Sequence, residues 1–152
     1  MVEIKIPKEY FLKNLNFGSN NKLENQKFTF IVKDKSYEVP KENAFLCCVF
    51  QNNKDISTFN VDIDDPQNLF KNIVLLLQGD AIVIKKEEYP FYFQVISLLK
   101  IEPVYQQLET LLNEEYQNEL VEYCFSNNNT ALMNSVFNLK NFDFNLSYNV
   151  LF

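Results

Sequence analysis

The sequence predicts an α+β protein in which a small mixed sheet is flanked by helices and followed by a helical C-terminal extension. Apolar residues alternate with their neighbours over 28–39 and 59–63, which is the period of a strand, and later recur with the period of a helix. Hydrophobic residues make up 47% of the 152 residues and only two are glycine, as expected for a globular chain without long flexible linkers. We therefore divide the chain into an N-terminal extension (1–22), a central domain (23–112) and the helical extension (113–152).

The first 63 residues are expected to form one short helix and three strands. Pro7 begins the helix, which runs to Leu15 and is followed by a polar loop over 16–22. Phe and Val alternate with polar residues on either side of a charged turn, so residues 28–39 predict a hairpin. A third strand is expected over 59–63, after a second polar loop.

A helix that is apolar on nearly every side is expected between the hairpin and the third strand. It follows Pro40, has an acidic residue in its first turn, and runs from Lys41 to Phe50. Such a helix is either buried on both sides or half-buried with a partner on the other side. In the second case one stripe of its side chains faces a partner protein, namely Phe45, Cys48 and Val49.

Residues typical of helix ends mark the rest of the central domain. Asp65 is expected to cap a helix that starts at Pro66 and ends at Gly79. A short strand over 81–84 and two helices between 89 and 112 follow.

The helix that begins near residue 89 carries three aromatic residues in its first turn. Tyr is common at interfaces because its ring packs while its hydroxyl stays in water. We expect Tyr89 and Tyr92 to contact a partner protein, and we assign Phe91 to the core.

The extension predicts two more helices. One carries a stripe of Tyr116, Leu120, Tyr123 and Cys124, and Thr130 is expected to cap the other. Apolar residues alternate again over 142–146. The chain ends on an apolar run, so we expect the full-length protein to continue past Phe152.

The residue types that are missing argue against several functions. The chain has no His, and its 14 cationic residues are all Lys, so it lacks the usual general base and also the Arg that binds phosphate in bidentate fashion. A net charge of −6 would repel a nucleic acid. We therefore expect no catalytic residue, no metal, no cofactor and no nucleic-acid partner.

Cysteine usage and apolar runs predict the compartment. Cys47, Cys48 and Cys124 lack metal-ligand spacing, and reduced thiols are typical of the cytosol and nucleus. The longest apolar run, 44–50, is too short to span a bilayer, and no signal segment opens the chain. We expect a cytoplasmic or nuclear protein that does not bind membranes.

Carboxylates supply the alternative function. Asp62, Asp64 and Asp65 suggest a calcium loop, but Gln67 and Ile73 occupy the positions that need glycine and a bidentate acid. Paired acids at 87–88 and 114–115 suit an acid/base mechanism, although acids are also favoured at helix starts for electrostatic reasons. The alternative is thus an enzyme or enzyme subunit that uses carboxylates.

The order of elements between 27 and 112 resembles the BTB/POZ domain family, which includes Skp1-like and elongin-C-like proteins. Phe28 to Val39 is similar to the family's first hairpin, and Lys41 to Phe50 is similar to its first helix. Val61 to Asp80 is similar to the family's series of a strand, an acidic cap, a helix and a glycine. Phe93 to Ile101 is similar to the helix that precedes the family's terminal pair of helices.

This resemblance implies a non-catalytic domain for protein–protein interaction, either an adaptor or a self-association module. It implies homodimerisation through the first helix, or recruitment to a cullin-type ubiquitin ligase scaffold. BTB domains are sometimes followed by ankyrin repeats, and the extension over 113–152 is a candidate lead-in to such an array.

Overall fold

The computed structural model describes residues 2–11, 26–53, 55–137 and 139. Leu15, the loop predicted over 16–22 and the alternation over 142–146 lie outside these ranges. The described chain is an α+β fold with two small sheets and several helices, which confirms the predicted class.

The larger sheet has three strands in the order β3-β2-β4. β2 (Lys27–Val32) pairs antiparallel with β3 (Lys35–Pro40), and the predicted hairpin is therefore confirmed. β4 (Thr58–Val61) pairs in parallel with the other edge of β2. The alternate side chains of β2 are buried, as its sequence predicts, and the rings of Phe28 and Phe30 pack against Phe50.

The second sheet joins the N-terminal segment to the central domain. β1 (Val2–Ile4) pairs antiparallel with β5 (Ile82–Ile84). The short strand at β5 was predicted, but no strand was predicted in the N-terminal segment. Residues 8–11 are helical, where a helix after Pro7 was expected.

The prediction of a single helix from Lys41 to Phe50 is wrong. The segment instead forms α2 (Lys41–Ala44), a turn, and a 3-10 helix η1 (Cys48–Phe50). Cys47 has an extended backbone, and the N–H of Cys48 donates to the carbonyl of Lys100, 3.0 Å away at the end of a later helix. A tertiary hydrogen bond thus replaces the local i→i−4 bond at this point.

Helix α3 (Phe70–Leu77) begins four residues after the predicted start at Pro66. The carboxylate of Asp65 still satisfies the helix start, because it accepts the N–H groups of Leu69 (2.7 Å) and Phe70 (2.9 Å) across an intervening turn. Gly79 ends the helix as predicted, with φ +94°, in a Schellman motif.

Four helices complete the described fold, close to the predicted ranges. After a 3-10 turn, η2 (Lys86–Glu88), they are α4 (Tyr89–Leu99), α5 (Glu102–Thr110), α6 (Glu114–Ser126) and α7 (Thr130–Phe137). One cap differs from the prediction. Asn129, and not Thr130, caps α7, because its side-chain oxygen accepts the N–H of Leu132 at 3.0 Å.

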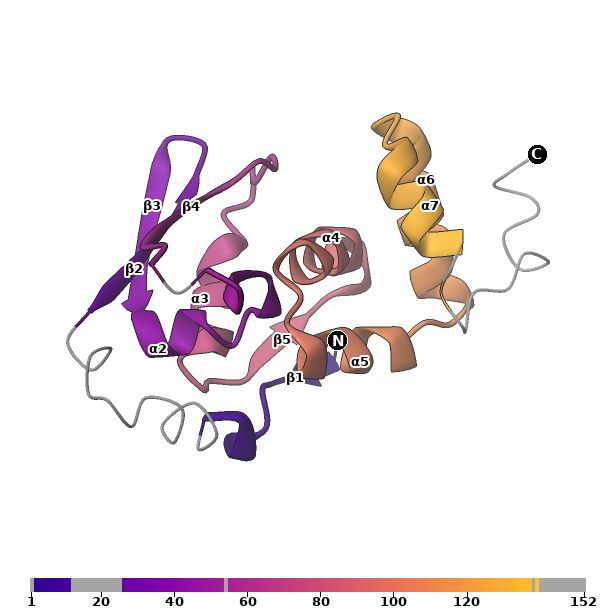
Figure 1. The fold of residues 1–152 in the computed structure, drawn as a ribbon. Helices are drawn as coiled ribbons and strands as arrows, with labels where there is room; N and C mark the ends of the chain where they lie inside the picture. The colour runs from indigo at the N-terminus through magenta and orange to yellow at the C-terminus, as the bar shows by residue number, and fades with distance from the viewer. Residues whose placement is uncertain (1, 12–25, 54, 138, 140–152) are drawn as a thin grey trace.

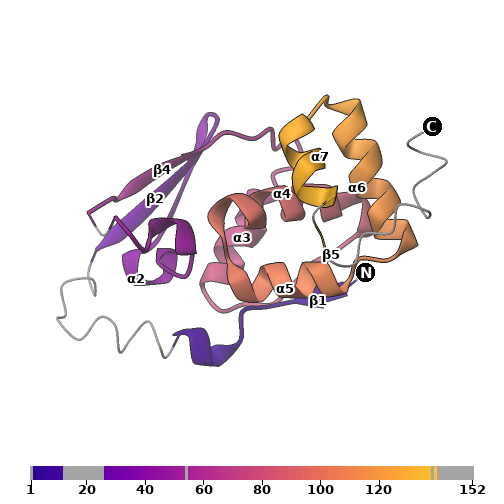
Figure 2. The same ribbon diagram turned by 45° about the vertical axis from the view of Figure 1, so that its right-hand side comes forward.

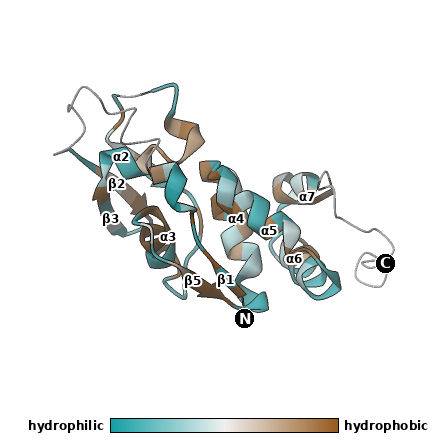
Figure 3. Ribbon diagram, turned by 90° about the horizontal axis from the view of Figure 1, so that it is seen from below, coloured by the Kyte–Doolittle hydropathy of each residue, from teal (hydrophilic) through white to brown (hydrophobic). Residues whose placement is uncertain are grey.

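The three-stranded sheet and the α6–α7 pair lie at opposite ends of the molecule, with α3 and α4 between them (Figures 1 and 2). β1, β5 and α5 run along the lower side in Figure 1. One apolar cluster extends from the sheet to α7, and α3 and β5 are its most hydrophobic elements in Figure 3. Within the described ranges, every helix is too short or too polar to span a bilayer.

Candidate functional site

The stripe predicted on the first helix is not a surface. Phe45 is only 6% exposed and belongs to the core, so its assignment to a partner interface is wrong. Cys48 and Val49 are half-buried. They lie on the 3-10 turn and not on the same helix as Phe45, because the chain breaks at Cys47.

The predicted contacts at Tyr89 and Tyr92 are also wrong, because both side chains are completely buried. The hydroxyl of Tyr89 donates to the carbonyl of Leu108 (2.6 Å), and Tyr92 accepts the side-chain N–H of Asn72 (2.8 Å). Burial raises the pKa of both phenols, that of Tyr92 to about 12. Each tyrosine thus finds its polar partner inside the molecule. Phe91 is buried, as expected.

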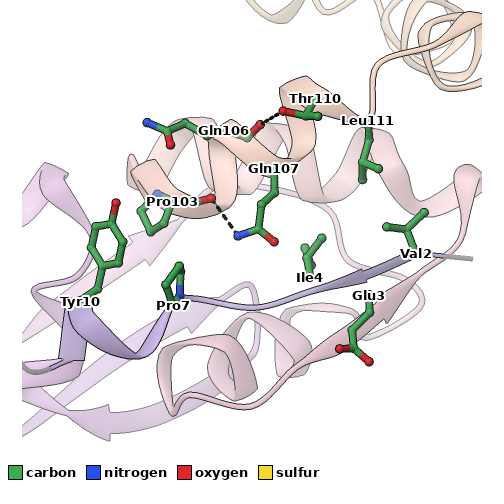
Figure 4. A pocket seen from close by; sticks show the side chains of 10 residues that line it. All are labelled: Val2, Glu3, Ile4, Pro7, Tyr10, Pro103, Gln106, Gln107, Thr110 and Leu111. Atoms are coloured by element: carbon green, nitrogen blue, oxygen red, sulfur yellow. Dashed lines mark hydrogen bonds between the residues drawn. The ribbon is translucent and has the colours of Figure 1, made fainter.

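A groove of about 410 Å³ runs between the N-terminal segment and α5 (Figure 4). The N-terminal side is mainly apolar, and the α5 side combines apolar residues with amides and a hydroxyl. The side chains that line the two sides include Val2, Ile4 and Pro7 and, opposite them, Gln106, Gln107, Thr110 and Leu111.

Gln107 binds the outer edge of the N-terminal strand as a neighbouring strand would. Its side-chain N–H donates to the carbonyl of Lys5 (2.7 Å), and its side-chain oxygen accepts the N–H of Lys5 (3.3 Å). One amide thus satisfies both backbone groups of a residue 102 positions earlier in the chain. It also donates to the carbonyl of Pro103 at 2.9 Å, which holds the side chain in place.

The same edge is open beside Glu3. Backbone groups point to alternate sides along an extended strand, so the N–H and C=O of Glu3 point the same way as those of Lys5, away from β5. Among the described strands, β5 alone pairs with β1, so no strand covers this outer edge. The side chains of Val2 and Ile4 point toward α5, and that of Glu3 points away (Figure 4). By this alternation, the groove offers one backbone donor and one backbone acceptor at Glu3, next to an apolar wall.

The sequence contains a signal for this strand that our prediction missed. Val2, Ile4 and Ile6 alternate with the charged residues Glu3 and Lys5, which is the period of a half-buried strand. Ile4 and Ile6 are both buried, as that period implies. No sequence pattern predicts that α5 forms the other side of the groove, because nothing near Gln107 in the sequence indicates its hydrogen bonds to Lys5.

Four of the carboxylates that suggested an enzyme line a second, smaller depression of about 140 Å³. They are Asp64, Asp65, Glu87 and Glu88. Asp65 is engaged at the start of α3, and Glu88 accepts the N–H of Lys85 at 3.0 Å. Two of the four carboxylates thus serve the backbone.

The remaining candidate groups do not form a metal or nucleophile site in the described part of the chain. Lys33 lies 3.4 Å from the carboxylate of Asp62 and 3.5 Å from that of Asp64, where a calcium loop would need the cation. Burial raises the pKa of Cys47 and of Cys124, which keeps both thiols protonated at neutral pH. No three His, Cys, Asp or Glu side chains of the described residues are arranged to hold a metal ion.

No model of a known protein family matches this chain. A comparison with curated proteins finds no match either.

Proposed function

We propose that this chain is a non-catalytic protein-interaction domain of the BTB/POZ type, and that its groove between β1 and α5 binds an extended segment of a partner protein. The element order supports the BTB/POZ assignment. A hairpin, a helix, a strand, a helix, a short strand and two helices follow one another from β2 to α5, in the order that the sequence resemblance implies. The parallel pairing of β4 with the hairpin gives a compact mixed sheet.

The open edge of β1 is the observation that carries the proposal. An unpaired strand edge is a template for another strand, and partner segments that add to it gain backbone hydrogen bonds while alternate side chains enter neighbouring pockets. Gln107 already makes such a two-point contact at Lys5. An incoming segment would continue this pairing at Glu3 and place apolar side chains against Val2 and Leu111.

The groove favours binding over the alternative, a carboxylate enzyme. Glu3 is its one acidic lining residue, and its side chain points out of the groove. A general acid/base mechanism needs titratable groups within hydrogen-bond reach of a substrate. The amides, hydroxyl and apolar side chains here supply shape and hydrogen bonds instead.

The family resemblance suggests two partner classes, a second copy of the chain and a cullin-type ligase scaffold. The burial of Phe45 removes the predicted helix stripe from the self-association model. The groove favours, within either class, a partner that contributes an extended strand over one that contributes a flat helix face.

Selection from a random library of short peptides tests the proposal, with the purified full chain as the target. Thr110 is exposed on the α5 side of the groove, and Thr110→Arg would fill the groove mouth with a long side chain. We expect enriched peptides to bind the unmodified chain and to bind Thr110→Arg about tenfold more weakly or worse, which corresponds to roughly 1.4 kcal/mol.

Thr58→Arg is the matched control, because Thr58 is an exposed Thr on β4, outside the groove. This variant should bind the peptides like the unmodified chain. Failure to enrich any peptide, or equal binding to both arginine variants and the unmodified chain, would refute the groove as the binding site.

A further inference from the structure

We propose a second docking surface, for a basic segment of a partner protein, at the depression between the turn before α3, the start of α4 and the last turns of α6. It goes beyond the groove function and shares none of its residues. Apolar side chains form its floor, namely Leu69, Pro90 and Phe91, and the half-buried ring of Tyr123 forms a wall. Carboxylates from two separate turns surround this apolar floor.

Negative charge around the depression extends beyond its lining. Burial raises the pKa of Glu119 on α6, and the charges of Glu122 and Glu87 raise it further, while Lys86 lowers it. Burial raises the pKa of Tyr123, and the charge of Asp64 raises it further. Carboxylates of α6 and η2 thus repel one another on this face, and a cation bound between them would relieve that repulsion.

Two of the lining carboxylates are available to a ligand. Glu87 is exposed and makes no hydrogen bond or ion pair with another described residue. Asp64 has Lys33 at 3.5 Å, but their side chains are 89% and 51% exposed, and such surface pairs are weak and exchange easily. Asp65 and Glu88 serve the backbone and add charge without changing partners.

The size and apolar lining of the depression determine which kind of side chain can occupy it. A depression of about 140 Å³ holds one side chain and not a folded surface. The aliphatic stem of Lys or Arg packs on apolar side chains while its charged head stays at the rim, and the ring of Tyr123 adds a cation–π contribution. The occupant is therefore a Lys or Arg with apolar neighbours, in a flexible segment of another protein.

Fluorescence anisotropy with a labelled peptide of alternating Arg and Leu tests this directly, with a Glu–Leu peptide of equal length as comparison. We expect the Arg–Leu peptide alone to bind, and more weakly as salt rises. The double variant Asp64→Asn, Glu87→Gln should weaken binding by about 2- to 30-fold, the range that two exposed ion pairs span. Both residues are exposed, so the fold should be unaffected, as a thermal melt would verify.

The matched control is the double variant Glu38→Gln, Asp80→Asn, which makes the same change in net charge at exposed residues elsewhere. It should bind like the unmodified chain, and so should Thr110→Arg. Equal weakening in both double variants would mean diffuse attraction by net charge and would overturn the proposal, as would no binding at all. Loss of binding only in Thr110→Arg would place the peptide in the groove, and so would also overturn it.

Discussion

The buried tyrosines of α4 differ from interface tyrosines in where their hydroxyls find partners. Tyr89 reaches the carbonyl of Leu108 and Tyr92 meets Asn72, so neither hydroxyl needs water. Their rings pack against other aromatic side chains, Tyr89 against Tyr116 and Tyr92 against Phe91. A sequence identifies a tyrosine but not the neighbour of its hydroxyl, which is why both were assigned to a partner surface.

A titration of the tyrosines tests this placement. Burial raises the pKa of Tyr92 to about 12, from an ordinary value of 10. The folded state then holds the phenolic proton more tightly than the unfolded state does. The free energy of unfolding should therefore be independent of this group below pH 10 and should fall as pH rises from 10 toward 12.

Ultraviolet difference titration of the unmodified chain against Tyr92→Phe isolates the phenolate of this one residue. We expect its step near pH 12. A step near pH 10 would place Tyr92 in water and restore it as an interface candidate.

Helix starts show how far local patterns predict an element. The N-cap residue of α3 is Leu69 and not the predicted Asp65, but the carboxylate of Asp65 still accepts the N–H groups of Leu69 and Phe70 at the helix start. Asn68, with φ +59°, accommodates the intervening turn, and the side chain of Asn68 accepts the hydroxyl of Tyr37 at 2.7 Å. The extra turn and its contact with Tyr37 thus separate the helix start from Asp65, and neither is indicated by the local sequence pattern.

Asp65→Ala should lower the free energy of unfolding by about 0.5–2 kcal/mol, the usual cost of losing a helix cap. Urea denaturation measures it. Asp62→Ala is the control, because among the described residues that exposed carboxylate pairs only with Lys33. If the two variants unfold alike, Asp65 does not hold the start of α3.

Two other elements mark the limits of prediction from periodicity. The segment 44–47 is buried, as its apolar composition implied, but its own domain covers it and no second subunit is required. The break there depends on the carbonyl of Lys100, which no local pattern reveals. β1, in contrast, has an alternation of apolar and charged residues that predicts a strand. Its partner strand β5 lies about 80 residues later in the chain, so local patterns could not predict the pairing.

At the scale of the whole molecule, the α+β class and most helices followed from the sequence, but the candidate site did not. The groove exists because β1 pairs with β5 and because Gln107 of α5 binds Lys5, contacts between residues far apart in the chain. Its open edge is a property of that assembly and of no single segment. The central claim is therefore that the backbone groups of Glu3 face this open edge and are free to bind a partner segment.

Hydrogen exchange of the Glu3 amide, measured by NMR with and without a peptide selected on the groove, tests that claim most directly. In the free chain Glu3 should exchange fast, because the alternation along the strand places its N–H on the same side as that of Lys5, which binds Gln107. Ile4 lies between them, so its N–H should face β5 and exchange slowly. Saturating peptide should slow the exchange of Glu3 and leave that of Ile4 nearly unchanged. A Glu3 amide that is already protected in the free chain, or that still exchanges fast in the complex, would contradict the account.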